Sequence, residues 1–180
     1  MKKTVNFVSE YFIYFMLYAL IGWLYEVFLE VVVYGWGYSN RGVLFGPYLP
    51  VYGVGALIFI VGFYRIIKGK SLKKKFILIP VIFLLCMISA TILELITSYI
   101  CEFFTGSWPW QTYSSYKYNF EARIALSPSI RFGIGGLIFL YLLQPAFERL
   151  ANNIINSKYK FILLMVAFIF IIDFIFSVFI

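Results

Sequence analysis

Long apolar blocks separated by short polar segments form the main pattern along this chain. The hydrophobic residues run in blocks of about twenty or more, instead of recurring at the spacing of an amphipathic helix or a half-buried strand. A helix needs about twenty apolar residues to cross a bilayer. The pattern therefore predicts an all-α integral membrane protein with about five transmembrane helices, at roughly 8–34, 47–67, 76–104, 127–147 and 159–180.

Composition supports the same class of protein. Hydrophobic residues make up 63% of the chain and charged residues only 13%, whereas about a quarter of an average soluble domain is charged. No segment is polar enough to form a separate soluble domain. We therefore expect one polytopic membrane domain over residues 1–180.

The N-terminal block resembles the start of a secretory signal, because Met1, Lys2 and Lys3 precede it. The block is too long for a signal core, contains Glu26 and Glu30, and lacks a cleavage site of small residues. We interpret it as a retained signal anchor.

Basic residues predict the orientation, since loops rich in lysine and arginine stay on the cytoplasmic side. Eleven of the 15 basic residues fall on one predicted side, namely Lys2, Lys3, Arg65, Lys68, Lys70, Lys73, Lys74, Lys75, Arg149, Lys158 and Lys160. The sequence thus predicts a multi-pass protein of the cell membrane with a cytoplasmic N-terminus and an extracellular C-terminus.

Motifs for cofactors are missing. The chain has no histidine, only Cys86 and Cys101, and no Gly-x-x-x-x-Gly-Lys-Ser/Thr segment. We expect no cofactor, no metal and no nucleic-acid partner, and any ATP dependence would need a separate cytoplasmic ATPase subunit.

Carboxylates occur within the apolar blocks, where each costs roughly 2.5 to 3.5 kcal/mol at the bilayer centre. Helical spacing places them in two stripes, one formed by Gly22, Glu26 and Glu30 and the other by Thr91, Glu94, Ser98 and Glu102. Such residues usually face a bundle interior or a water-filled cavity.

The predicted orientation puts both stripes near the two outer loops, which carry asparagines and arginines. We predict an outward-facing polar cavity in which arginine pairs with glutamate, and whose solute-binding residues are Glu26, Glu30, Asn40, Arg41, Glu94, Ser98, Glu102, Asn119, Arg123 and Arg131. The alternative is that these groups are ion pairs that only hold the bundle together. Asp173 stands apart, and snorkelling to the interface or contact with a partner helix is as plausible for it as a functional role.

The chain also contains an internal similarity, in which Gly53-Val-Gly-Ala-Leu-Ile-Phe59 echoes Gly133-Ile-Gly-Gly-Leu-Ile-Phe139. Each copy follows a helix with two glutamates and a loop with asparagine, arginine and proline. This order predicts a parallel internal repeat with halves 8–67 and 76–147, followed by an additional helix at 159–180. We interpret the glycines as sites of close helix packing and the loop 40–53 as a re-entrant or lid segment.

Several strings resemble the ABC-transporter type IV family, also called CmpB-like, over roughly residues 15–145. They are Gly22-Trp23-Leu-Tyr25-Glu26, Asn40-Arg41-Gly42-Val-Leu44-Phe-Gly46-Pro47-Tyr-Leu-Pro50-Val-Tyr52-Gly53, Leu93-Glu94, Ser98, Glu102, Trp110, Asn119, Arg123-Ile124, Leu126, Ser129 and Gly133. Two positions depart from the family pattern: Ala122 stands where glycine is expected, and Phe132 where tryptophan is expected.

The resemblance implies a permease that works with a separate ATPase. The leading hypothesis is a transporter permease subunit, embedded in the lipid bilayer as a homo-oligomer, that binds a polar or charged solute. One alternative is a membrane enzyme acting on a lipid or lipid-linked substrate, with a glutamate as general base. Another is a non-catalytic assembly or sensory protein.

Overall fold

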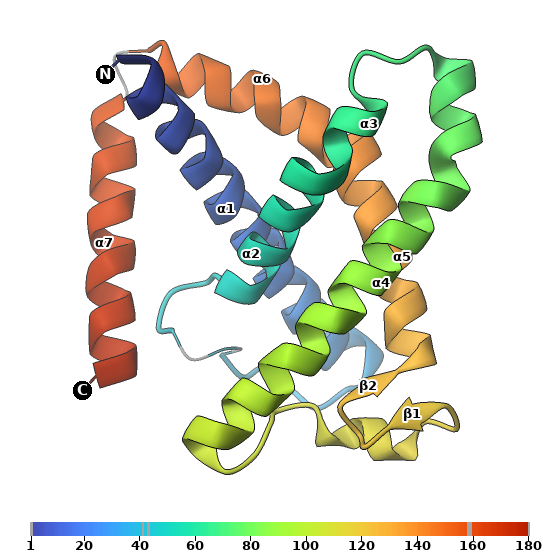
Figure 1. The fold of residues 1–180 in the computed structure, drawn as a ribbon. Coiled ribbons are helices and arrows are strands. Elements are labelled where there is room, and N and C mark those ends of the chain that lie inside the picture. Colours follow the sequence, from blue (N-terminus) through green and yellow to red (C-terminus); the bar gives the residue numbers. More distant parts are fainter. Residues whose placement is uncertain (1, 41, 43, 158–159, 180) are drawn as a thin grey trace. The chain divides into compact units, whose positions relative to one another are not determined.

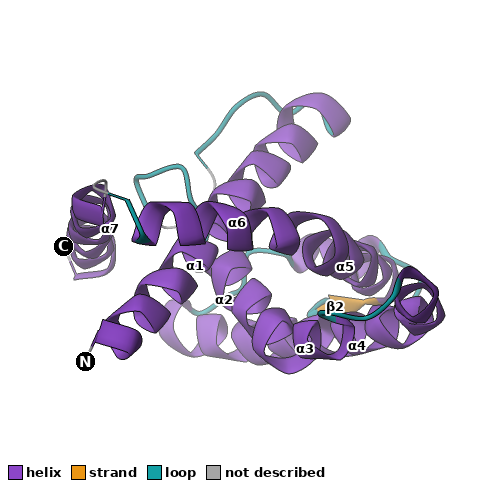
Figure 2. Ribbon diagram, turned by 90° about the horizontal axis from the view of Figure 1, so that it is seen from above, coloured by secondary structure: helices purple, strands orange, loops and turns teal. Residues whose placement is uncertain are grey.

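The structure, a computed structural model, describes residues 2–40, 42, 44–157 and 160–179. Figure 2 shows that helix makes up most of the described chain. Figure 1 traces the α-helices in chain order: α1 (Lys2–Phe28), α2 (Pro50–Phe59), α3 (Arg65–Ile67), α4 (Leu72–Thr105), α5 (Leu126–Ile138), α6 (Gln144–Ile155) and α7 (Lys160–Phe179).

Three π-helical turns lengthen these helices. The first, η1 (Leu29–Val33), extends α1; the second, η2 (Ile60–Tyr64), joins α2 to α3; and the third, η4 (Phe139–Leu143), joins α5 to α6. Each pair of joined segments therefore forms one longer continuous helix.

Four of the described helical stretches are long and apolar enough to cross a membrane, namely Asn6–Val33, Pro50–Ile67, Leu72–Thr105 and Leu126–Ile155. The fifth predicted helix is present as α7, with a shorter apolar stretch at Phe161–Ser177, near the lower limit of spanning length. Its predicted limits at 159 and 180 lie outside the described residues. The predicted class, an all-α integral membrane protein, is confirmed.

The chain forms two compact units, one comprising Met1–Leu57 with Pro145–Ile180 and the other Ile58–Gln144. In the first unit, the loop before α2 packs against α1 through Leu44 and Tyr48, which form a buried cluster with Ala19. The amide of Leu49 donates a 2.9 Å hydrogen bond to the carbonyl of Ala19, in the middle of the first span. The loop thus reaches back along α1 from its C-terminal end to the middle of the helix.

Aromatic packing joins α7 to the same unit. The ring of Phe170 lies 5.4 Å from that of Phe15 on α1 and 5.5 Å from that of Tyr48. Phe15 also lies against Gly53, where any Cβ atom would overlap its ring. The glycine therefore permits close approach of α1 and α2.

In the second unit, α4 and α5 lie side by side (Figure 1). Gly133 faces Phe83, and a Cβ atom on Gly136 would lie 2.5 Å from the Cβ of Cys86. The predicted role of the glycine segments in close helix packing is confirmed at Gly53, Gly133 and Gly136.

The loop after α4 has its own short structure. A 3₁₀ turn, η3 (Gln111–Ser115), precedes two short strands, β1 (Asn119–Phe120) and β2 (Ile124–Ala125). The strands pair antiparallel, with Asn119 opposite Ala125 and Phe120 opposite Ile124, and β2 leads directly into α5 (Figure 1). The hairpin therefore positions residues 121–123, which lie between the two strands, near the ends of α4 and α5.

The close packing at Gly136 yields a stability prediction. Gly136→Ala is expected to lower the free energy of unfolding by about 1–3 kcal/mol relative to Gly135→Ala, because the backbone-anchored Cβ of Cys86 cannot move aside. Gly135 is the matched control, since a methyl group there meets nothing within 4 Å and both changes gain the same helix propensity. Thermal unfolding in detergent measures both, and equal melting temperatures would contradict the prediction.

Candidate functional site

The second polar stripe forms a set of contacts along one face of α4. Thr91 Oγ1 lies 2.8 Å from Ser129 Oγ on α5, and Glu94 Oε1 accepts a 2.8 Å hydrogen bond from the hydroxyl of Tyr113. At the C-terminal end of the stripe, Glu102 pairs with Arg123 at 2.5 Å. The ion pair predicted between an arginine and a glutamate therefore forms in this unit.

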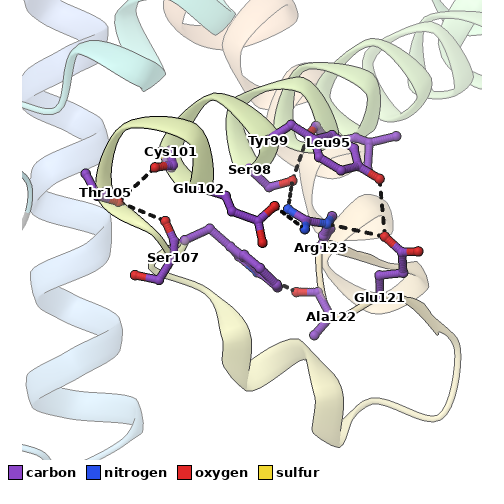
Figure 3. A network of polar contacts seen from close by, with 11 residues as sticks. Leu95, Ser98, Tyr99, Cys101, Glu102, Thr105, Ser107, Glu121, Ala122 and Arg123 are labelled. Carbon is purple, nitrogen blue, oxygen red and sulfur yellow. Dashed lines mark hydrogen bonds and ion pairs between the residues drawn. The ribbon is translucent and has the colours of Figure 1, made fainter.

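Arg123 is enclosed by protein groups (Figure 3). Its guanidinium carbon lies 4.1 Å from the centre of the Tyr99 ring and 4.0 Å from that of Trp108, and its Nε lies 3.4 Å from Glu121. Only 6% of the residue is exposed. Burial alone would lower the pKa of Arg123, but the hydrogen bond and charge of Glu102 outweigh it and raise the pKa, so the cation is firmly held.

The hairpin between β1 and β2 positions this arginine. Asn119 accepts a 3.1 Å hydrogen bond from the amide of Ala122, and the indoles of Trp108 and Trp110 donate to the carbonyls of Ala122 and Arg123 at 3.0 and 2.8 Å. Asn119, predicted to contact solute, is thus a turn residue in the described structure.

Glu94 differs from Glu102 in having no arginine partner among the described residues. Its Oε2 atom is buried and has no hydrogen-bond partner among the described residues. An unpaired carboxylate oxygen at this depth is costly, so a ligand or a proton at this atom would be stabilising.

The first polar stripe uses hydroxyl groups and backbone amides. Glu26 accepts a hydrogen bond from the hydroxyl of Tyr52, and Glu30 accepts from both the hydroxyl and the amide of Ser39, at 2.6 and 3.2 Å. Asn40 accepts from the indole of Trp23 at 3.1 Å and donates to the carbonyl of Leu44. Arg41 lies outside the described residues.

Asp173 forms contacts that the sequence did not reveal. This α7 residue is 9% exposed and accepts hydrogen bonds from the amides of Phe45 and Gly46 at 3.0 and 2.8 Å, from Ser177 Oγ at 2.9 Å, and from the hydroxyl of Tyr48. Burial and the bond to Asp173 both raise the pKa of Tyr48. Asp173 therefore holds the loop before α2, and its isolation in an apolar helix was the only available signal.

Arg131 belongs to a different part of the second unit. Its Nη2 donates to the hydroxyl of Tyr116 at 2.9 Å and to Ser127 Oγ at 3.3 Å. It lines a shallow depression of about 350 Å³ together with Lys117. The structure therefore separates Arg131 from the contacts of Arg123.

Helices of membrane-crossing length and polar networks at their ends define a multi-pass helical membrane protein. The family described as "Putative ABC-transporter type IV" matches residues 13–178, and the chain belongs to this family. The match includes α7 and Asp173, beyond the segment that the sequence resemblance covered. Neither a curated protein nor a solved structure matched the chain.

The position of Ala122 yields a prediction, because this residue replaces the glycine expected from the family pattern. Its φ of 54° lies in the left-handed region, which costs a residue with a Cβ atom roughly 1–2 kcal/mol. Ala122→Gly is expected to raise the free energy of unfolding by about 1 kcal/mol, measured by thermal unfolding. Ala125→Gly, in the extended β2, is the control and should lower it.

The network around Asp173 yields a second prediction. Asp173→Asn replaces one acceptor oxygen by a donor, so the amides of Phe45 and Gly46 cannot both keep their hydrogen bonds. The free energy of unfolding is therefore expected to fall by about 2 kcal/mol. Hydrogen exchange should speed up at these two amides. Ser177→Ala keeps the carboxylate and should have the smaller effect; equal exchange rates in both variants would contradict the assignment.

Proposed function

We propose that this protein is the permease subunit of a transporter and that its solute contacts the membrane-embedded carboxylate Glu94, with Glu26 as the corresponding carboxylate of the first unit. The observation that carries the proposal is the buried Oε2 of Glu94, which has no partner in the described part of the chain. Family membership supports the transporter class. The outward-facing cavity predicted from the sequence is the expected route to these residues.

The chemistry of the carboxylates favours a solute with a positive charge or several hydrogen-bond donors. Glu94 and Glu26 are in contact with tyrosine hydroxyls, which leave the negative charge uncompensated. Arg123 is already paired with Glu102 and stacked between two aromatic rings. We assign Arg123 and Glu102 to the scaffold and Glu94 and Glu26 to the solute.

The predicted internal repeat makes these two glutamates equivalent. Phe15 packs on Gly53 in one half as Phe83 packs on Gly133 in the other. Phe15 precedes Glu26 by the same number of residues that separate Phe83 from Glu94. Matching contacts at matching spacing support a duplication, in which each half carries one such carboxylate.

The π-helical turns give independent support for the repeat. In one half η2 begins at Ile60, shortly after Gly53, and in the other η4 begins at Phe139, shortly after Gly133. The two turns thus occupy nearly the same place in the two copies. Such turns are rare and often mark functional positions.

A separate cytoplasmic ATPase and a homo-oligomer remain part of the proposal. The amphipathic α6 offers a surface for the ATPase: Phe147 packs its ring 5.0 Å from that of Tyr18, while Arg149, Asn152 and Asn153 are exposed. The predicted orientation, with a cytoplasmic N-terminus, places α6 on the ATPase side. Low burial of the four spans, at most 33%, supports additional contacts with lipid or other subunits.

Transport assays with Glu94→Gln test the proposal. Gln can still accept from Tyr113 but carries no charge, so protein level should persist while uptake of a cationic probe, choline or spermidine, falls on the order of tenfold in proteoliposomes. Glu121→Gln, at an exposed loop position, is the matched control. Absence of binding or flux in wild-type protein, with no ATPase co-purifying from native membranes, would count against the proposal.

A further inference from the structure

The outer end of α5 carries a second group of charges that the proposed solute site does not use. Lys117 and Arg131 both line the shallow depression of about 350 Å³, together with Tyr116, Tyr118 and Ser127. No carboxylate is among the described residues that line it. The depression therefore presents two cations and three hydroxyl groups, which are suitable partners for a phosphate group.

Aromatic contacts position the two cations. The ammonium of Lys117 lies 5.4 Å from the centre of the Tyr118 ring, and the guanidinium carbon of Arg131 lies 5.9 Å from that of Tyr116. The hydrogen bonds that Arg131 donates to Tyr116 and Ser127 also fix the orientation of its guanidinium group. Tyrosine and basic side chains at the end of a membrane helix are typical of the headgroup region of a bilayer.

An apolar track leads from the depression along α5. Leu126 and Ile130 line the depression, and Ile134 follows on the same helical face, one turn further. The three side chains are 49%, 39% and 49% exposed, respectively. The buried side of α5 carries Gly133 and Gly136, which pack against α4. The exposed stripe therefore faces the lipid and lies in line with the cations.

We propose that Lys117 and Arg131 bind the phosphate-bearing headgroup of an anionic phospholipid, whose acyl chain lies along Leu126, Ile130 and Ile134. An anionic lipid would contact both parts of the site, because its headgroup places a negative charge beside the cations and its acyl chain lies on the apolar track. Inorganic phosphate would use only the charged part. This site does not depend on the proposed transport function.

Native mass spectrometry of the full chain in detergent tests the site, with phosphatidylglycerol and phosphatidylcholine as probes. The wild type should retain phosphatidylglycerol preferentially. Lys117→Gln with Arg131→Gln should weaken this binding on the order of tenfold or more, because two charged partners are lost. The charge-conserving pair Lys117→Arg with Arg131→Lys should preserve most of it.

Two further arms keep the outcome decisive. Lys117→Gln alone changes one exposed side chain and should fold, so it should still weaken binding several-fold if the double variant is poorly assembled. A photoactivatable phosphatidylglycerol should crosslink within residues 116–134, which separates this site from the basic segment around Lys73 and Lys74.

Three results would overturn the proposal. One is equal retention of phosphatidylcholine, which would mean that charge is not recognised. Another is undiminished phosphatidylglycerol binding in the Gln variants. The third is displacement of the lipid by a modest excess of inorganic phosphate, which would identify a free anion as the ligand.

Discussion

A polar group on an apolar helix is costly unless it has a partner within the protein, and this constraint shapes the loop before α2 and the loop after α4. In the second unit, the loop after α4 folds back so that Arg123 meets Glu102 and Tyr113 meets Glu94. In the first unit, the loop before α2 supplies amides to Asp173. The described parts of both loops thus supply donors to carboxylates on the helices.

The two units meet this requirement with different chemistry. The second unit uses a guanidinium, which stacks between Tyr99 and Trp108 and neutralises a carboxylate. The described part of the first unit uses hydroxyls and backbone amides, as at Glu30 and Asp173, which bind a carboxylate without cancelling its charge.

The sequence predicted the features that depend on local periodicity. Apolar block length gave the helices, and spacings of three and four placed Glu94, Ser98 and Glu102 on one face of α4. The hydrogen-bond partners of the carboxylates were harder to predict, because Tyr113 and Ser39 carry no signal that distinguishes them from other loop residues. The partners of Asp173 could not be predicted for the same reason, since two of its donors are backbone amides, which nearly every residue possesses. The left-handed turn at Ala122 was hidden because the residue that would have revealed it, glycine, is absent.

Charged groups that already have a full set of partners can be distinguished from charged groups that still lack one. Arg123 combines an ion pair, two aromatic faces and almost complete burial, so a solute would have to break existing contacts to reach it. Glu94 is half-buried, and its buried Oε2 has no partner in the described structure, so a ligand there would gain an interaction without displacing one. Binding energy comes from such differences between the free and bound protein. Under the proposed transport function, Glu94 is therefore the membrane-embedded carboxylate at which a small change in the chain should have the largest effect on solute and the smallest on fold.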